Sequence, residues 1–561
     1  MCGIFALIGH RLPAAEARAV AVRQGSLLRH RGPDWSGAFA DERFALAHER
    51  LSIVDVHGGA QPLRGEDGRL LLAVNGEIYN HTELRAANPW PYATGSDCEV
   101  ILPLFRSKGR ELCRDLRGMF AFVVVDTVSG HWMIARDHVG IIPLYVGRTA
   151  TGGLAVASEM KALMEVCTHV QAFPPGHVQT DADEAPQPWY VPEWRDFDAV
   201  EAAAGDARPD PAALREALCE AVHSHLMGDV PYGVLLSGGL DSSVVAAVAA
   251  RQAATRVDTG DTEPAWWPRV HSFCIGLEGS PDLAAAEGIA RHIGTAHHGF
   301  TFTVEEGLDA LRDVIWHIES FDVTTVRAST PMFLIARRIK SMGVKMVLSG
   351  EGADEIFGGY LYFHKAPDAR AFHEETVRKV FDLHKFDCLR ANKSMSAFGV
   401  EARVPFLDRR FLDYAMGIPA RHKMVGERRI EKELLRRAFD GWLPDSLLWR
   451  QKEQFSDGVG YSWIDSLKAH AARVVSDRDM AEVAERFPVS TPSTKEGYFY
   501  RTIFDELFKL PSAAATVPSG PSIACSTAAA VEWDASFKLR ADPSGRAVAG
   551  VHDDAVSDAA G

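Results

Sequence analysis

The sequence lacks the features that mark several classes of protein. Its 561 residues hold eight scattered cysteines and no Cys-x-x-Cys pair, so neither a zinc site nor a disulfide framework is expected. No apolar run approaches the roughly 18 residues that cross a bilayer, and no basic region precedes the short apolar segment at the N-terminus. Basic charge is also scarce, because the formal net charge is −15. We therefore predict a cytoplasmic protein without a membrane or nucleic-acid partner.

The chain is too long for one hydrophobic core and corresponds to about three or four domains of average size. A stretch rich in Asp, Glu and Pro near residues 180–187 marks the exit from a first domain, which we place at residues 2–190. A second domain is expected at residues 205–510. Residues 511–561 are rich in Ala, Ser, Pro and Gly, so they are predicted to form a disordered tail.

The most informative stretch is Ser237-Gly-Gly-Leu-Asp-Ser-Ser243, which lies between two apolar runs. This order predicts a strand, a tight turn and a helix. The glycines let the backbone approach a ligand, and the serine hydroxyls and the first N–H groups of the helix suit an anion. The loop lacks the lysine of the G-x-x-x-x-G-K-[ST] motif and resembles instead the pyrophosphate loop of ATP pyrophosphatases. A serine- and glycine-rich turn without a ligand is the alternative.

Alternating strand and helix patterns after this loop predict a parallel sheet flanked by helices. Further strands are expected at residues 270–276, 297–302 and 345–349. Ligands bind beyond the carboxyl ends of such strands, where both the Ser237 loop and the turn at residues 350–355 lie. The carboxylates of Asp241 and Asp354 would repel phosphates unless a hard cation joined them, so Mg²⁺ is predicted there. For both aspartates a helix N-cap is the alternative.

Cys2 is a candidate nucleophile. It lies between Met1 and Gly3, a context in which Met1 is usually removed, so that the mature chain would begin with cysteine. A free α-amine with a pKa of about 8 can then take the thiol proton, directly or through water. An incidental second residue is the alternative, and segments farther along the chain weigh against it.

Those segments resemble the N-terminal-nucleophile glutamine amidotransferases. They are Arg29-His-Arg-Gly-Pro-Asp34, Ala47-His-Glu-Arg-Leu-Ser-Ile-Val-Asp55, Leu71-Leu-Ala-Val-Asn-Gly-Glu-Ile-Tyr-Asn80, Gly95-Ser-Asp97 and Arg136-Asp-His-Val-Gly-Ile-Ile-Pro143. The resemblance implies a four-layer αββα sandwich. It also implies that Cys2 is the nucleophile and that the side chain of Asn75 and the N–H of Gly76 form the oxyanion hole.

The same resemblance assigns a glutamine site. Arg50 would pair with the α-carboxylate of glutamine through two hydrogen bonds, and Asp97, with the region of Glu77, would bind its α-ammonium. The glutamine-binding residues implied are Arg50, Leu51, Ser52, Ile53, Val54, Asn75, Gly76, Glu77 and Asp97. A surface ion pair is the alternative for Arg50 and Asp97.

The second half resembles asparagine synthetase, and the order of the two domains is that of the glutamine-hydrolysing type B enzymes, nearer the bacterial and plant members than the animal ones. The likeness runs from Cys2 to about Phe508. It implies an ATP-dependent ligase that converts aspartate to β-aspartyl-AMP and pyrophosphate. Ammonia from glutamine would cross an apolar tunnel and displace AMP, yielding asparagine. The resemblance also leaves room for a homodimer.

Ligase residues are carried over by the same match. ATP and pyrophosphate would contact Leu236, Ser237, Gly238, Gly239, Asp241, Ser242, Ile275, Ser349, Gly350 and Lys452. Thr324 and Arg327 match the aspartate-binding segment. Glu351 matches a catalytic carboxylate that handles the proton of the amine, and a structural partner of a nearby arginine is its alternative role.

Three rival functions are weaker. A β-lactam-forming synthetase shares the ligase half, but its internal amine makes Cys2 unnecessary. An RNA-modifying ATP pyrophosphatase needs a basic face and usually a reactive cysteine pair, which the charge and the scattered cysteines oppose. A scaffold without catalytic activity would not need the nucleophile, the glutamine residues and the ligase carboxylates together. The sequence leaves the identity of the acceptor acid open.

Overall fold

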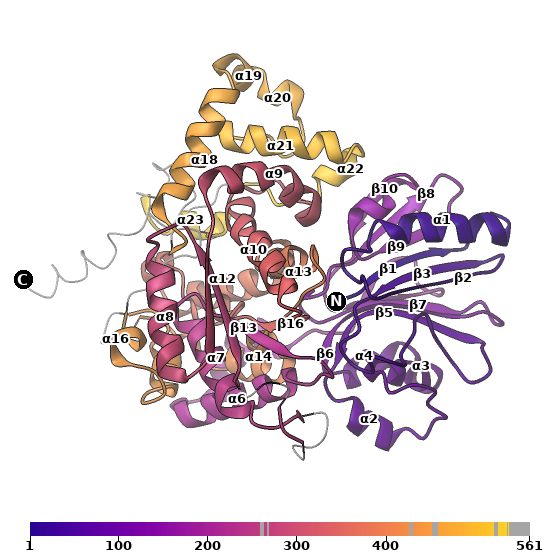
Figure 1. Cartoon of the computed structure of the whole chain (residues 1–561), viewed down its shortest axis with the longest axis horizontal. Coiled ribbons are helices and arrows are strands. Elements are labelled where there is room, and N and C mark those ends of the chain that lie inside the picture. Colours follow the sequence, from indigo (N-terminus) through magenta and orange to yellow (C-terminus); the bar gives the residue numbers. More distant parts are fainter. Residues whose placement is uncertain are drawn as a thin grey trace, which may run out of the picture.

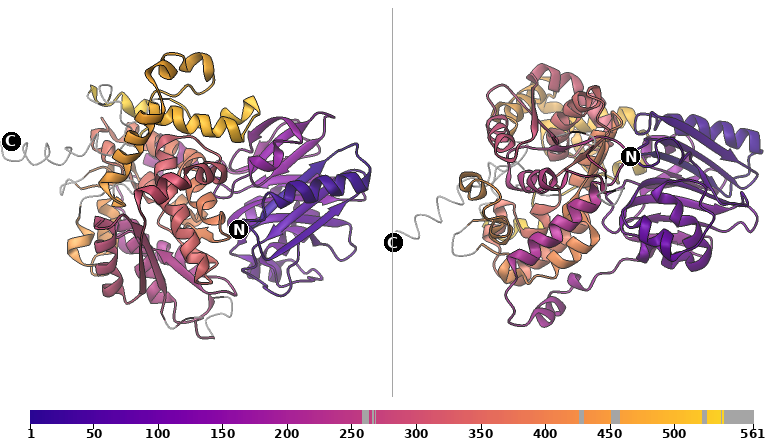
Figure 2. Two further views of the ribbon diagram at one scale, coloured as in Figure 1. Left: turned by 45° about the horizontal axis from the view of Figure 1, so that its top comes forward. Right: turned by 60° about the horizontal axis from the view of Figure 1, so that its bottom comes forward.

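The computed structural model describes residues 1–257, 263–265, 267, 269–425, 430–450, 458–520, 525–535 and 537. The chain forms two parts that lie side by side (Figure 1). The N-terminal part is built on two antiparallel sheets, and the C-terminal part on one parallel sheet surrounded by helices. The connecting segment contains α5 (Phe197–Ala204) and runs along the outside of the molecule (Figure 2).

The N-terminal part has four layers. Its first sheet has the order β10-β8-β9-β1-β3-β2 and its second the order β12-β11-β7-β6-β5-β4. The strands of the first are β1 (Gly3–Ile8), β2 (Trp35–Ala40), β3 (Phe44–Arg50), β8 (Tyr145–Thr149), β9 (Leu154–Ala157) and β10 (Cys167–Ala172). Those of the second are β4 (Leu63–Arg64), β5 (Leu70–Ile78), β6 (Gly118–Asp126), β7 (Trp132–Arg136), β11 (His177–Thr180) and β12 (Gln187–Pro188). Helix α1 (Ala14–Ser26) covers one outer face, and α2 (His81–Ala87), α3 (Ile101–Lys108) and α4 (Leu112–Asp115) cover the other (Figure 1).

Strand β6 explains why the sheets stack. Residues 119–125 are an unbroken apolar run, and successive side chains of a strand point to opposite faces. Met119, Ala121 and Val123 join the core between the two sheets. Phe120 and Phe122 join a second core beneath the outer helices. Both faces of this sheet are therefore buried, as the absence of polar alternation in the run predicts.

The C-terminal part is organised around a sheet of order β15-β14-β13-β16-β17, in which every neighbouring pair is parallel. Its strands are β13 (Tyr232–Leu235), β14 (His271–Gly276), β15 (Ala296–Thr301), β16 (Met346–Leu348) and β17 (Glu401–Arg403). The chain order reverses between β13 and β16, and ligands of open parallel sheets bind at such a reversal. The predicted fold class is confirmed for both parts.

Helices surround this sheet. The longer ones are α6 (Pro211–His225), α7 (Leu240–Gln252), α8 (Pro281–Ile293), α9 (Val304–Ile318), α10 (Val323–Ser341), α12 (Ala369–Asp382), α13 (Asp387–Ser396), α18 (Tyr461–Val474) and α21 (Lys495–Leu507). The shorter ones are α11 (Ala353–Phe357), α14 (Arg409–Met416), α15 (Glu433–Ala438), α16 (Asp445–Leu448), α19 (Asp477–Ala481) and α20 (Val483–Arg486). In the described part of the chain, no helix is long and apolar enough to span a bilayer.

The structure differs from the expectations at one edge of the sheet and in the tail. Residues 401–403 pair with β16 and extend the parallel sheet beyond the strands that were predicted. The tail prediction is wrong for residues 511–520, 525–535 and 537. Helix α22 (Pro511–Ala514) packs on β10, and α23 (Ala528–Val531) joins an aromatic cluster that includes Tyr362 and Phe363. Residues 538–561 lie outside the described part.

Candidate active sites

The candidate nucleophile lies between the two antiparallel sheets. The backbone N–H of Cys2 donates to Asn75 Oδ1 at 2.7 Å, and the Cys2 thiol lies 3.8 Å from the carbonyl oxygen of Leu51. With Met1 in place this nitrogen is an amide, and the chain's terminal ammonium pairs with Glu401 at 2.8 Å. Removal of Met1 turns the backbone nitrogen of Cys2 into a free α-amine. This amine is bonded to the same Cα as the side chain that carries the thiol.

The environment of the thiol requires a base. Burial raises the pKa of Cys2, and the nearby terminal ammonium opposes that rise. The thiol is therefore protonated at neutral pH. Beside it, Gly76 has a φ of 142°, and a Cβ at this position would lie 2.0 Å from the carbonyl oxygen of Met119. Glycine is required because the chain passes so close to β6.

Arg50 ends β3 and directs its guanidinium at the loop that follows. Its Nη1 donates to the carbonyl oxygen of Gly58 at 2.7 Å, and its Nη2 donates to those of Val54 and Asp55 at 3.0 and 2.7 Å. Three of its five N–H groups thus hold the loop in place. Arg50 is bonded within the protein rather than free on the surface.

Residues 51–54 of this loop are fixed from the C-terminal part. The backbone N–H of Asp229 donates to the carbonyl oxygen of Ile53 at 2.8 Å. Lys345 Nζ donates to the carbonyl oxygen of Ser52 at 3.3 Å and to Asp34 at 2.7 Å. The structure therefore brings the predicted loop to the candidate nucleophile with the help of elements more than 170 residues away.

Two buried carboxyl groups, Glu77 and Asp97, lie near each other, and Glu77 also lies near the Cys2 thiol. Asp97 Oδ2 accepts a hydrogen bond from the backbone N–H of Ile78 at 2.6 Å. Burial raises the pKa of Glu77, and the charges of Glu401 and Asp97 add to that rise. Burial also raises the pKa of Asp97. A buried pair of anions favours a cation, and an α-ammonium group meets that need.

The pyrophosphate-like loop follows β13 as predicted. Ser237 Oγ and Ser242 Oγ lie 3.1 Å apart, and the backbone N–H of Gly239 donates to Ser237 Oγ at 3.4 Å. Gly239 is the N-cap of α7, and because glycine has no side chain it cannot cap the first N–H groups of that helix. Gly238 has a φ of 79°, and a Cβ there would lie 2.6 Å from that of Ala285. The N-terminus of α7 thus presents N–H groups that can bind an anion.

One cavity of about 1070 Å³ collects the ligase residues. The predicted residues that line it are Leu236, Ser237, Gly238, Gly239, Asp241, Ser242, Ile275, Thr324, Arg327, Ser349, Gly350, Glu351 and Asp354. Lys452 lies outside the described residues. Residues 515–520 and 525–528 of the tail also line the cavity. The predicted ligase residues come from loops at the carboxyl ends of β13, β14 and β16 and from α10.

A lysine that the sequence did not single out lies between the predicted metal ligands. Lys432 Nζ is 2.7 Å from each carboxylate oxygen of Asp241 and 2.6 Å from Asp354 Oδ1. Its side chain is 1 % exposed, and its φ of 57° is unusual for a residue other than glycine. The backbone is thus held in an unfavourable conformation that places an ammonium group between two carboxylates.

This arrangement fits a magnesium site. Three carboxylate oxygens converge on one point, and oxygen is the ligand atom that Mg²⁺ prefers. Within the described residues no group of three or more His, Cys, Asp or Glu side chains could hold a metal by itself. Mg²⁺ commonly uses one or two carboxylates together with substrate phosphates, so Asp241 and Asp354 would suffice beside the Ser237 loop.

The predicted acceptor residues lie at the start of α10. Arg327 is 2 % exposed and forms two hydrogen bonds with Glu496 of α21, at 2.9 and 2.6 Å. Thr324 Oγ1 donates to Asp322 Oδ2 at 2.7 Å. Arg327 reaches the cavity, but one edge of its guanidinium is engaged by Glu496, which the sequence did not indicate.

Glu351 pairs with Arg390 of α13, whose Nη2 lies 2.8 Å from Glu351 Oε2. Burial raises the pKa of Glu351, although the charge of Arg390 opposes the rise. The alternative role predicted for Glu351, as partner of an arginine, is therefore present in the structure. The two roles are compatible, because a carboxylate oriented by an arginine on one side can accept a proton on the other.

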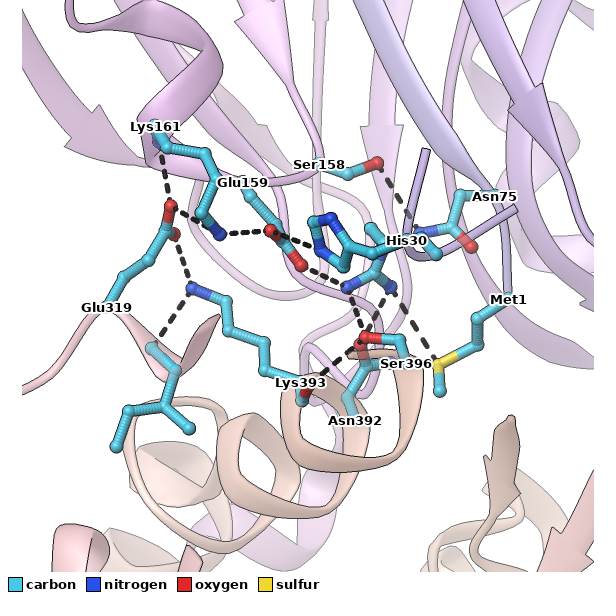
Figure 3. A network of polar contacts seen from close by, with 12 residues as sticks. Met1, His30, Asn75, Ser158, Glu159, Lys161, Glu319, Asn392, Lys393 and Ser396 are labelled. Carbon is cyan, nitrogen blue, oxygen red and sulfur yellow. Dashed lines mark hydrogen bonds and ion pairs between the residues drawn. The ribbon is translucent and has the colours of Figure 1, made fainter. Parts of the chain in front are cut away.

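A network of buried charged side chains lies where the two parts of the chain meet (Figure 3). Arg31 donates to the carbonyl oxygen of Cys2 at 2.9 Å, to Glu159 at 2.7 Å and to Asn392 of α13 at 2.8 Å. On the same helix Lys393 pairs with Glu319 at 2.6 Å. Helix α13 therefore has contacts toward both sites: Asn392 bonds to Arg31, which bonds to Cys2, and Arg390 pairs with Glu351. Removing one member of such a buried network is expected to destabilise the protein strongly.

Comparisons with known proteins agree with this geometry. The glutamine amidotransferase domain family matches residues 1–183, and the asparagine synthase family matches residues 213–371 and 365–535. The chain is 58 % identical over 557 residues to asparagine synthetase B (glutamine-hydrolyzing) of Escherichia coli strain K12, covering 99 % of this chain and 100 % of that protein. It is 54 % identical over 562 residues to the glutamine-hydrolyzing asparagine synthetase of Asparagus officinalis, covering 99 % and 94 % of the two chains.

Proposed function

The chain belongs to the glutamine-hydrolysing asparagine synthetases, and from that premise we propose how its two sites divide the reaction. The enzyme forms L-asparagine from L-aspartate, L-glutamine and ATP, and the other products are L-glutamate, AMP and pyrophosphate. The N-terminal site hydrolyses glutamine, and the cavity around the Ser237 loop activates aspartate.

In the first site, the α-amine of Cys2 takes the thiol proton after removal of Met1. The thiolate attacks the carboxamide carbon of glutamine, and Asn75 and Gly76 donate hydrogen bonds to the oxyanion. Ammonia leaves, and water releases glutamate from the thioester. Arg50 binds the α-carboxylate, while Glu77 and Asp97 bind the α-ammonium. The buried pair of carboxyl groups beside a protonated thiol supports this assignment.

In the second site, the β-carboxylate of aspartate attacks the α-phosphorus of ATP, and the bond to pyrophosphate breaks. Ser237, Ser242 and the N–H groups of α7 hold the pyrophosphate. Arg327 and Thr324 orient aspartate. Ammonia then attacks the acyl carbon of β-aspartyl-AMP, AMP leaves, and Glu351 accepts the proton of the amine.

Asp241 and Asp354 would hold Mg²⁺, which neutralises charge on the phosphates when it is bound. Lys432 then has to leave the space between the two carboxylates, and the pyrophosphate oxygens are a suitable second partner for its ammonium group. We also infer that the enzyme acts in the cytoplasm, without a membrane or nucleic-acid partner, and a homodimer remains a prediction.

One observation carries the proposal. The described residues predicted for ATP, aspartate, metal binding and proton transfer come from segments up to 118 positions apart, and in the structure they line one cavity. Cys2, Asn75, Glu77 and Asp97 gather at a separate place in the other part of the chain. A β-lactam-forming synthetase has no use for that second group.

Replacing the nucleophile tests the division of labour. Cys2→Ala should still bind glutamine but release no glutamate, because no thiolate remains. Ammonium salt at mildly alkaline pH, where more free ammonia is present, should restore asparagine, AMP and pyrophosphate. Glu351→Ala should lose synthesis from either nitrogen source and keep glutamine hydrolysis.

Product analysis by mass spectrometry with each candidate acid decides the acceptor, and intact mass shows whether Met1 has been removed. Glutamine-dependent synthesis by folded Cys2→Ala, or its failure to use ammonia, would contradict the two-site scheme.

A further inference from the structure

Arg403 belongs to the ligase part and reaches into the glutamine site. It ends β17, the edge strand of the parallel sheet, and its side chain is 0 % exposed. Its Nε donates to Glu401 Oε1 at 2.7 Å, and its Nη1 donates to the carbonyl oxygens of His225 and Met227. These bonds to three separate groups fix the plane of the guanidinium.

The remaining nitrogen faces Glu77 across the boundary between the two parts. Arg403 Nη2 lies 3.3 Å from Glu77 Oε2, and the Glu77 side chain is 8 % exposed. Neither of these two atoms has a partner with hydrogen-bond geometry among the described residues. Two buried groups of opposite charge therefore face each other, and each can still form a hydrogen bond. A polar ligand beside Glu77 can form such a bond.

The backbone of the same residue touches the ATP site. The carbonyl oxygen of Arg403 accepts a hydrogen bond from the backbone N–H of Ser349 at 2.8 Å. Ser349 and Gly350 open the turn that lines the ligase cavity. This backbone bond does not depend on the Arg403 side chain, so a substitution at Arg403 can separate the two contacts.

We propose that Arg403 is a positioning residue of the glutaminase site, supplied by the ligase part, and that it orients Glu77 toward the α-ammonium of glutamine. The inference rests on the proposed glutaminase function. Glu77 is buried near the carboxylates of Asp97 and Glu401, so it needs a cation to keep its negative charge. Arg403 supplies that charge in a fixed direction. Without it, Glu77 would turn away from glutamine or take up a proton, and it would then attract the ammonium less.

The test compares Arg403→Met, Arg403→Lys and a matched control, Arg117→Met. Arg117 crosses the same boundary and pairs with Asp408 at 2.9 Å, with 11 % of its side chain exposed. Its ion pair within the described part of the chain is with Asp408 and not with Glu77. Arg403→Met should raise the KM for glutamine about tenfold or more, with a much smaller change in kcat. Arg403→Lys should recover part of this loss, and Arg117→Met should not raise the KM.

Two further measurements separate positioning from a general structural role. Ammonia-dependent asparagine synthesis should stay within about twofold of wild type in both Arg403 variants, because the backbone bond to Ser349 survives. The second measurement uses glutaramate, which is glutamine without its α-amino group, as a competitor of glutamine. Its affinity should be the same in wild type and Arg403→Met, because it has no ammonium for Glu77 to bind.

Three outcomes would overturn the inference: an unchanged KM for glutamine, an equal loss for glutaramate, or a parallel loss of ammonia-dependent synthesis. If Arg403→Met does not fold, Arg403→Lys decides by the same criteria. Failure of the proposed function would look different, since the wild-type enzyme itself would then release no glutamate from glutamine.

Discussion

Lys432 shows how a single side chain can occupy the position proposed for a metal ion. Its ammonium lies between Asp241 and Asp354, and three carboxylate oxygens surround it within 2.7 Å. A divalent cation at the proposed site would use the same oxygens. The proposal therefore predicts that the lysine and the metal compete for one position and that the lysine moves when the metal binds.

Lys432→Met should strengthen binding of Mg²⁺ or Mn²⁺ in the absence of ATP, because the competing ammonium is gone. It should also lower the melting temperature in metal-free buffer, since breaking a buried ion pair typically costs about 3–5 kcal/mol. Isothermal calorimetry and the Mn²⁺ electron paramagnetic resonance signal would measure the metal affinity. Lys385→Met is the control, because Lys385 also lines the cavity but pairs with the half-exposed Asp382. Equal metal affinity in wild type and Lys432→Met would contradict the competition.

At the scale of elements, the ligase cavity depends on the reversal of strand order between β13 and β16. Gly350 lies so close to the first turn of α7 that a Cβ there would be 2.7 Å from the backbone nitrogen of Ser242. The two turns that begin the site are therefore packed directly against each other. The tail then closes one side of the same cavity through residues 515–520 and 525–528 and through Val531 of α23.

A chain that ends at residue 510 should lose ligase affinity and stability. Val517, Val531 and Phe537 are at most 6 % exposed, and burying one such side chain contributes on the order of 1.5–3 kcal/mol. We expect a melting temperature several degrees lower and a higher KM for ATP or aspartate, with glutamine hydrolysis largely kept. A chain that ends after Phe537 is the control and should behave as wild type. A truncation at 510 with unchanged melting and kinetics would show that the packed tail contributes nothing.

At the scale of the whole molecule, two buried histidines and one half-buried histidine, all neutral at pH 7, are expected to make stability depend on pH. Burial lowers the pKa of His48 and of His225 to about 3 and that of His317 to about 2. In the unfolded chain a histidine titrates near about 6.5. Below that pH the unfolded state binds protons that the folded state does not, so stability is present above pH 6.5 and is lost as the pH falls toward 3.

Melting measured at a fixed scan rate should therefore move to lower temperature between pH 7 and pH 5. The expected loss is on the order of 2 kcal/mol for each of the three histidines at pH 5, from the gap between pH 5 and the unfolded pKa. His317→Gln should reduce this pH dependence, whereas the exposed His292→Gln should leave it unchanged. A melting temperature that stays constant over this range would refute the assignment of these histidines as neutral.

Much of the fold could be predicted because its signals are local. The run at residues 119–125 indicates a strand covered on both faces, and the order of strand, glycine turn and helix around Ser237 indicates an anion site. The tail was predicted wrongly because its composition is poor in large apolar residues. Small residues such as Ala513 and Ala514 still pack closely when the rest of the chain offers a complementary surface, and composition does not record that surface.

The sequence by itself determined which chemistry is proposed for the chain. Cys2, the Asn75-Gly76 pair and the Ser237 heptad each carry their proposed nucleophile or hydrogen-bond donors within a few consecutive residues. Tertiary structure alone decided which charges complete the two sites. Lys432 meets Asp241 from 191 positions away, and Glu496 meets Arg327 from 169. Arg403 reaches Glu77 only because β17 pairs with β16 at the boundary of the two parts. Such pairs depend on which surfaces pack together, and no periodic pattern in a chain specifies the partner of a single charged side chain.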